Sequence, residues 1–225
     1  MATPLTDSIE ALTDYINEVT GGSDDNLSDA IATLADGYGS GGISIDDFVN
    51  GSKPTGIVRT NATSMDIGGR FHGSSVTEFH APLLVDMAKD GVSNCTTLQV
   101  VDCPLLESVG SNAFYGCTSL SSVNLPKLGI VAGYSFYNNK ALTYIKLLHA
   151  WKFNGASFQN CTSLKTVVLP NATVIDKNVF SNCTAITDIY VPNAESSYSN
   201  APWGATNATI HYNTQFDANG DPILE

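Results

Sequence analysis

The chain has few basic residues: 10 Lys and Arg stand against 22 Asp and Glu, which gives a net charge of −12. All of the basic residues follow position 52, so the N-terminal segment carries only acidic charge. Binding to nucleic acid through phosphates needs a basic stripe, and attraction to anionic lipid needs a basic cluster. We therefore expect no nucleic-acid partner. We assign the acidity to solubility, with an acidic docking surface as the alternative.

Long apolar runs and catalytic motifs are also missing. No stretch reaches the roughly 18 apolar residues of a membrane-spanning helix, so we expect no membrane insertion. The four histidines lie far apart without metal-ligand spacing, and no nucleophile elbow, phosphate loop or dinucleotide motif occurs. We therefore expect no catalytic residues, metal or cofactor. The first residues form no export signal, although a chain trimmed after its signal would look the same.

What the chain does have is a repeat of 22 residues. Apolar residues recur in fixed columns at this interval, as in Phe114, Phe136, Phe158 and Phe180, or Leu120, Leu142, Leu164 and Ile186. Other columns hold Cys, with Asn139 as an exception, or Pro, with Leu148 as an exception. A period of this size is typical of a solenoid, in which stacked coils share one core.

Each repeat contains a strand signal and a turn signal. The clearest unit runs from residue 113 to 126, where Leu120, Val123 and Leu125 alternate with polar residues as in a half-buried strand. Pro126 removes a ladder donor and ends the strand, and the segment around Phe114 reads as a tight turn or one 3₁₀ turn. An ordinary β-sandwich is the alternative, but it would not need the same residue type at the same position of every repeat.

We expect the five cysteines to be reduced, buried groups.

The segment Ala113-Phe114-Tyr115-Gly116-Cys117-Thr118-Ser119-Leu120, with Val123, Leu125, Pro126 and its counterparts through Pro192, closely resembles the BspA-type leucine-rich repeat family. The resemblance implies a mainly β chain that forms a right-handed leucine-rich-repeat β-solenoid. We place about six coils at residues 60–192, after a linker or first strand at 43–59. The family is a scaffold for adhesion and recognition, so the motif specifies the fold and not the ligand.

The N-terminal residues 1–42 predict a small helical hairpin. Apolar residues follow heptad spacing in the first helix and one face of the second, and the set is Leu5, Ile9, Leu12, Ile16, Val19, Leu27, Ile31 and Leu34. A helix of this length is marginal alone and needs a partner. We expect these residues to mediate self-association or docking on a larger assembly. Capping of the solenoid's open end is the alternative.

Residues 193–225 predict a C-terminal cap and tail, in which Trp203 covers the last coil and Ile210 lies on a closing strand. These flanks also resemble repeat proteins encoded among phage and prophage structural genes of gut bacteria. That resemblance implies location in a virion, with other virion proteins or further copies as partners. The bacterial cell surface is the alternative location.

Outward residues of the strands form columns that suit a recognition face, an ordinary solvated sheet being the alternative. The coil with Asn139 and Leu148 also departs from the repeat at Trp151 and Lys152, where function is expected. One aromatic-basic patch is predicted there, unless the departures are drift. The ligand-surface candidates are Tyr137, Tyr144, Lys146, Trp151, Lys152, Asp188 and Tyr190.

We expect a non-enzymatic phage tail or virion-surface protein that binds a bacterial surface glycan or protein. A trimmed bacterial adhesin and a purely structural virion spacer are the alternatives.

Overall fold

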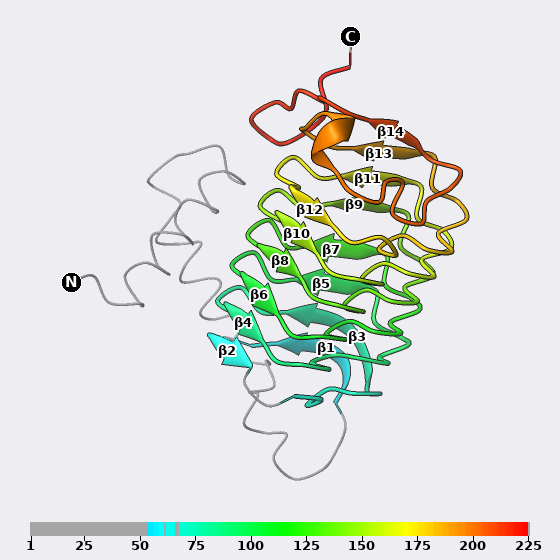
Figure 1. Ribbon diagram of the computed structural model, residues 1–225. Coiled ribbons are helices and arrows are strands. Elements are labelled where there is room, and N and C mark those ends of the chain that lie inside the picture. The colour runs from blue at the N-terminus through cyan, green and yellow to red at the C-terminus, as the bar shows by residue number, and fades with distance from the viewer. Residues whose placement is uncertain (1–53, 61, 66–67, 225) are drawn as a thin grey trace, which may run out of the picture.

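The computed structural model describes residues 54–60, 62–65 and 68–224 as a parallel β-solenoid of about seven coils (Figure 1). Two columns of strands run along its axis. The long-strand face holds β1 (Thr55–Arg59), β3 (Ser75–His80), β5 (Val100–Asp102), β7 (Ser122–Asn124), β9 (Tyr144–Lys146), β11 (Thr166–Val168), β13 (Asp188–Tyr190) and β14 (Thr209–His211). The short-strand face holds β2 (Ser64–Met65), β4 (Asp86–Met87), β6 (Ser108–Val109), β8 (Ile130–Val131), β10 (Lys152–Phe153) and β12 (Val174–Ile175).

The predicted phenylalanine column is confirmed. Phe136 and Phe158 stack with ring centroids 4.9 Å apart, and the distances from Phe114 to Phe136 and from Phe158 to Phe180 are 5.0 and 5.7 Å. All four rings are fully buried. Because each coil places the same side chain over the one before it, the coils together bury a core that one coil could not enclose.

The cysteine column lies in this core and holds free thiols, as expected. The thiols of Cys161 and Cys183 donate to the backbone carbonyls of Phe136 and Phe158, at 3.1 and 3.0 Å. Burial raises the pKa of Cys117 and Cys161 well above the usual thiol range. These two thiols are therefore protonated, and each donates to a carbonyl of the preceding coil.

The residue before each cysteine-column position turns the chain in the left-handed region. Its φ is 55° at Asn94, 69° at Gly116, 63° at Asn138 and 65° at Asn160. Asn and Gly tolerate this conformation better than other residues. This backbone requirement explains why the sequence places Asn or Gly immediately before the cysteine column, and the turn predicted around each Phe is confirmed.

The short-strand face is an addition to the predicted architecture, because the repeat pattern was interpreted as one strand per coil. Its signal is a further inward column of Val109, Val131, Phe153 and Ile175, all of which are buried. Each strand of this face has only two residues, which is too short for alternation to be recognised in sequence.

Both ends of the described structure extend the sheets past the predicted solenoid segment 60–192. The strand β1 begins at residue 55 and pairs with β3, and β14 pairs in parallel with β13 after the short 3₁₀ helix η3 (Glu195–Ser197). Trp203 is fully buried and packs edge-on against Tyr198 at 5.3 Å, as a cap requires. The predicted helical hairpin lies outside the described residues. Within the described ranges no helix is long and apolar enough to cross a membrane.

Candidate functional site

The long-strand face is interrupted between β7 and β9. Strands β1, β3, β5 and β7 form one sheet, and β9, β11, β13 and β14 form another. On either side of the interruption a repeated bond joins neighbouring coils, from Cys103 N–H to Asn124 C=O at 3.1 Å and from Leu147 N–H to Val168 C=O at 3.2 Å. The equivalent bond from Leu125 N–H to Lys146 C=O is not formed. Backbone donors and acceptors in this gap therefore lack their ladder partners.

The two coils stay in contact on their other sides. On the short-strand face β8 and β10 remain paired. In the core Phe114 stacks on Phe136 at 5.0 Å, and on the third side Tyr115 stacks on Tyr137 at 4.9 Å. The separation is therefore confined to the long-strand face, where it opens a wedge between the coils.

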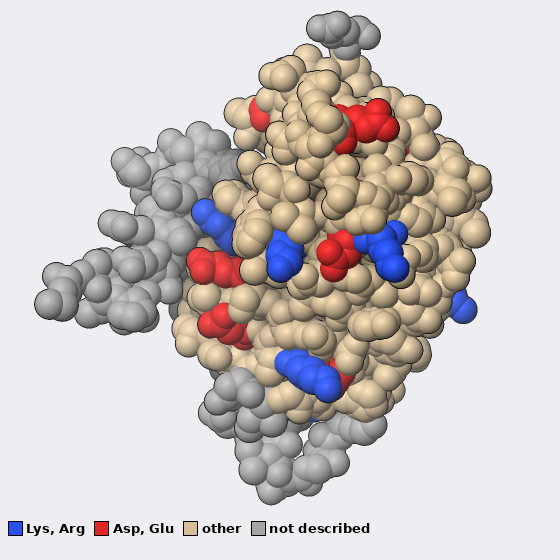
Figure 2. Space-filling model, in the orientation of Figure 1, with Lys and Arg blue, Asp and Glu red and all other residues tan. Residues whose placement is uncertain are grey.

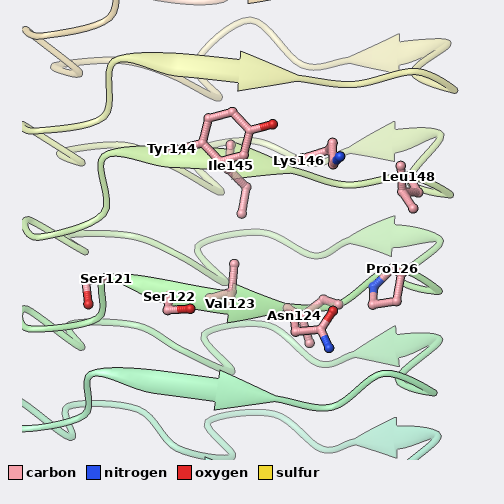
Figure 3. A pocket seen from close by; sticks show the side chains of 10 residues that line it. Ser121, Ser122, Val123, Asn124, Pro126, Tyr144, Ile145, Lys146 and Leu148 are labelled. Atoms are coloured by element: carbon pink, nitrogen blue, oxygen red, sulfur yellow. The ribbon is translucent and has the colours of Figure 1, made fainter. Parts of the chain in front are cut away.

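This wedge is a cleft of about 240 Å³, called the β7–β9 cleft below. Its lining consists of Ser121, Ser122, Val123, Asn124, Leu125, Pro126, Tyr144, Ile145, Lys146 and Leu148. Figure 3 shows β7 and β9 further apart than the strands above and below them, with Val123 and Tyr144 on opposite sides of the gap. Val123 is only partly buried, whereas its counterparts Val101 and Ile145 are almost fully buried. The cleft thus reaches apolar atoms of the core.

The C-terminal residues 213–224, called the strap below, pack beside one end of the cleft. The Lys146 ammonium lies 2.8 Å from a carboxylate oxygen of Asp221 and donates to the carbonyl of Asn219 at 3.1 Å. Gly220 lies so close to Leu148 that an added Cβ would clash with the leucine Cδ2. Leu148, which stands where the other coils have proline, therefore packs against the strap.

Tyr144 lies at the mouth of the cleft and is 45% exposed. Figure 3 shows its ring over β9, on the side of that strand away from β7, and its hydroxyl directed along the strand towards Lys146. Partial burial raises the pKa of the Tyr144 hydroxyl. The hydroxyl is therefore protonated at neutral pH and can donate a hydrogen bond.

Polar side chains connect the coils on the other side of the cleft. Asn124 donates its amide to Asp102 at 2.8 Å, and His80 contacts Asp102 at 3.5 Å and Glu78 at 2.9 Å. The hydrogen bond to Asp102 is the main cause that raises the pKa of His80. The pKa of Asp102 is lowered by its bonds to His80 and Asn124, which outweigh the opposing effect of burial.

The predicted candidates Asp188 and Tyr190 lie in β13, two coils beyond the cleft. Asp188 accepts a hydrogen bond from His211 at 2.8 Å, which lowers the pKa of its carboxyl group. Tyr190 stacks on the His211 ring at 4.3 Å. Between this group and the cleft, the outward column residue Val168 is 1% exposed, so the long-strand face is not open along its whole length.

The structure does not assemble the predicted aromatic-basic patch on one face. Tyr144 and Lys146 lie in β9 on the long-strand face, while Lys152 lies in β10 on the short-strand face with Trp151 just before it. Tyr137 lies on the third side, where it stacks on Tyr115. A coil turns a corner between residues 146 and 152, so side chains only a few positions apart in sequence point from different sides of the solenoid.

The described residues show little sign of a charged or metal-binding centre. Within the described ranges, no group of three or more His, Cys, Asp and Glu side chains is placed to hold a metal ion. Figure 2 shows acidic and basic residues of both signs scattered over the visible face, without a basic stripe. The arrangement in the β7–β9 cleft supplies an aromatic ring, hydroxyls, an amide and backbone groups. These are groups for binding a ligand.

Sequence reasoning found Tyr144 and Lys146 but missed the other side of the cleft, formed by Ser122, Val123 and Asn124. These residues obey the repeat, so nothing marks them out. The available signal was in the next coil, where Asn139 and Leu148 break their columns. The consequence of that departure for the neighbouring coil depends on strand pairing, which the sequence does not display.

Stacked parallel coils with a recurring Phe and Cys core define a repeat protein of the leucine-rich solenoid class. Residues 71–204 match the family model described as BspA type leucine rich repeat region, in six copies. The chain therefore belongs to the BspA-type leucine-rich repeat family. None of the curated proteins compared with it matches.

Solved structures show the same kind of fold. The leucine rich repeat protein of T. pallidum aligns with a TM-score of 0.51 and 12% identity, over 73% of this chain and 83% of that one. A leucine rich cell surface protein from Faecalibacterium prausnitzii has a TM-score of 0.49 and 19% identity, over 63% of this chain and 36% of that one. The pneumococcal vaccine antigen PcpA has a TM-score of 0.47 and 15% identity, over 62% and 35%. This chain thus spans about a third of the last two proteins, and the likeness concerns the fold alone.

Proposed function

We propose that the chain is a non-enzymatic recognition protein that binds a bacterial surface glycan or protein through its long-strand face. The observation that carries this proposal is the β7–β9 cleft, where a rigid sheet opens to expose Val123, polar side chains and backbone groups without ladder partners. Membership of a repeat family whose fold serves as a binding scaffold supports it. Asp188 and Tyr190 lie on the same face beyond the covered Val168, and we propose them as a separate part of the binding surface.

The proposed setting is the surface of a phage virion, for example its tail. The acidic N-terminal segment and the Trp203 tail support this setting through their resemblance to flanks of phage-encoded repeat proteins. The N-terminal apolar residues would then join copies of the chain or attach it to other virion proteins. The alternative setting is a bacterial cell surface.

Binding of the purified full chain to bacterial cells tests the recognition role. We expect saturable binding to some gut bacterial strains, which flow cytometry of fluorescently labelled protein would detect. A chain that serves only as a virion spacer would bind no strain while still assembling through its N-terminal segment. Immunogold labelling of phage particles and of bacterial cells with an antibody against the chain would separate the two settings.

A further inference from the structure

We propose that the β7–β9 cleft is a binding subsite for a neutral sugar ring, which stacks on Tyr144 and donates and accepts hydrogen bonds inside the cleft. This inference rests on the proposed recognition function and names the ligand class for that same surface. The first reason is the chemistry of the opening. An exposed tyrosine face and the partly exposed Val123 supply apolar contact, while Ser121, Ser122 and Asn124 supply hydroxyls and an amide.

The second reason is the backbone of the gap. Leu125 N–H and Lys146 C=O would bond to one another in an unbroken ladder, and both residues line the cleft without that bond. The bond from Thr143 N–H to Ser121 C=O, which has counterparts in the neighbouring coils, is also not formed. A pyranose carries several hydroxyl groups, each able to donate and to accept. Such a ligand can satisfy donors and acceptors that alternate along two strand edges.

The third reason concerns size, and it separates a sugar from an inserted peptide strand. Adding a strand between β7 and β9 requires two inter-strand spacings of about 4.8 Å in place of one. The coils cannot separate that far, because β8 and β10 remain paired and Phe114 stacks on Phe136 at 5.0 Å. A cleft of about 240 Å³ is also smaller than the roughly 300–1,000 Å³ of pockets for drug-sized ligands. It suits a single ring at the mouth.

The fourth reason is charge, and it favours a neutral ligand over an anionic one. The only basic side chain in the lining, Lys146, is already paired with Asp221 at 2.8 Å. Asp102 lies next to the lining residue Asn124, with which it shares a hydrogen bond of 2.8 Å. A carboxylate or sulfate on the ligand would meet these acidic groups without a free cation to balance it.

The test is saturation-transfer NMR and titration of the full chain with methyl glycosides of glucose, galactose, mannose and N-acetylglucosamine. N-acetylneuraminate and an unstructured hexapeptide serve as the anionic and peptide probes. We expect at least one neutral glycoside to bind in the millimolar range, and Tyr144→Ala to weaken that binding about tenfold. Tyr144→Phe keeps the ring and should bind within about threefold of the native chain.

Tyr134→Ala is the matched control, because Tyr134 is exposed to a similar degree, 49% against 45% for Tyr144, but lies on another side of the coil. It should bind as the native chain does, and thermal melts should show that all three variants fold. The proposal is overturned if no neutral glycoside binds, if Tyr144→Ala binds unchanged, or if the anionic sugar or the peptide is preferred. Cell binding that persists in such a case would leave the recognition function standing and remove only the sugar subsite.

Discussion

Replacing Asn139 by cysteine should stabilise the solenoid. Asn139 occupies the cysteine column, is fully buried, and has neither amide oxygen nor amide nitrogen hydrogen-bonded within the described structure. In the next coil Cys161 donates its thiol to the carbonyl of Phe136 at 3.1 Å. A cysteine at 139 would stand in the same relation to the carbonyl of Phe114, one coil earlier. The variant therefore replaces an unsatisfied amide by a donor of suitable length.

The expected gain follows from the cost of the buried amide. A buried polar group without a partner costs about 1–3 kcal/mol, and a neutral hydrogen bond contributes about 0.5–1.5 kcal/mol. Cys and Asn are similar in volume, so little is lost to a cavity. We expect the free energy of unfolding to rise by about 2 kcal/mol. For a chain of this length such a gain corresponds to a melting temperature higher by about 4–8 °C.

Differential scanning calorimetry of the full chain under reducing conditions measures this change. The reverse exchange, Cys161→Asn, is the matched variant, because it places an amide where a satisfied thiol stood. It should lower the melting temperature by a similar amount. An unchanged or lower melting temperature for Asn139→Cys would show that the amide is satisfied in solution, and the reasoning from the column would then fail.

Three further changes test other parts of the fold. Ser157→Ala removes the other buried side-chain polar group without a partner in the described structure, a hydroxyl, and should raise the free energy of unfolding by about 1 kcal/mol in a denaturant titration. Trp203→Ala removes the buried indole of the cap and should lower the free energy of unfolding by about 3–5 kcal/mol in the same assay. A decrease below about 1 kcal/mol would contradict the capping role. The hydrogen bond to Asp102 raises the pKa of His80. The stabilisation that protonated His80 provides is therefore complete below the pKa of histidine in the unfolded chain, and it is lost as the pH rises through the pKa of His80 in the folded chain. The melting-temperature advantage of the native chain over His80→Gln should therefore shrink as the pH rises through and above the usual histidine pKa, and an advantage that is constant or grows with pH would oppose this account.

The repeat columns were readable from the sequence because each column has one local environment in every coil. Phe136 and Phe158 need the same buried space, and Asn138 and Asn160 need the same left-handed turn, so the same residue types recur at the same interval. The cap followed from a similar argument, since the last coil must be covered and Trp203 is the largest apolar side chain there.

The candidate site was only half predictable, for reasons that lie in packing between coils. Tyr144 and Lys146 stood out because they occupy outward positions in an irregular coil, and both line the cleft. Ser122 and Asn124 did not stand out, because their own coil is regular. The residues of the predicted aromatic-basic patch lie on different faces, because the chain turns a corner between the long-strand and short-strand faces that sequence distance does not show.

The amino-acid sequence alone indicates that this chain stacks 22-residue coils around a shared apolar core, since only repeated burial accounts for columns of one residue type. The place where two of those coils part is visible only in the three-dimensional contacts. The sheets end at β7 and β9, and beside this gap the strap contacts Lys146 and Leu148. Those contacts join residues more than 70 positions apart, and no local pattern records them.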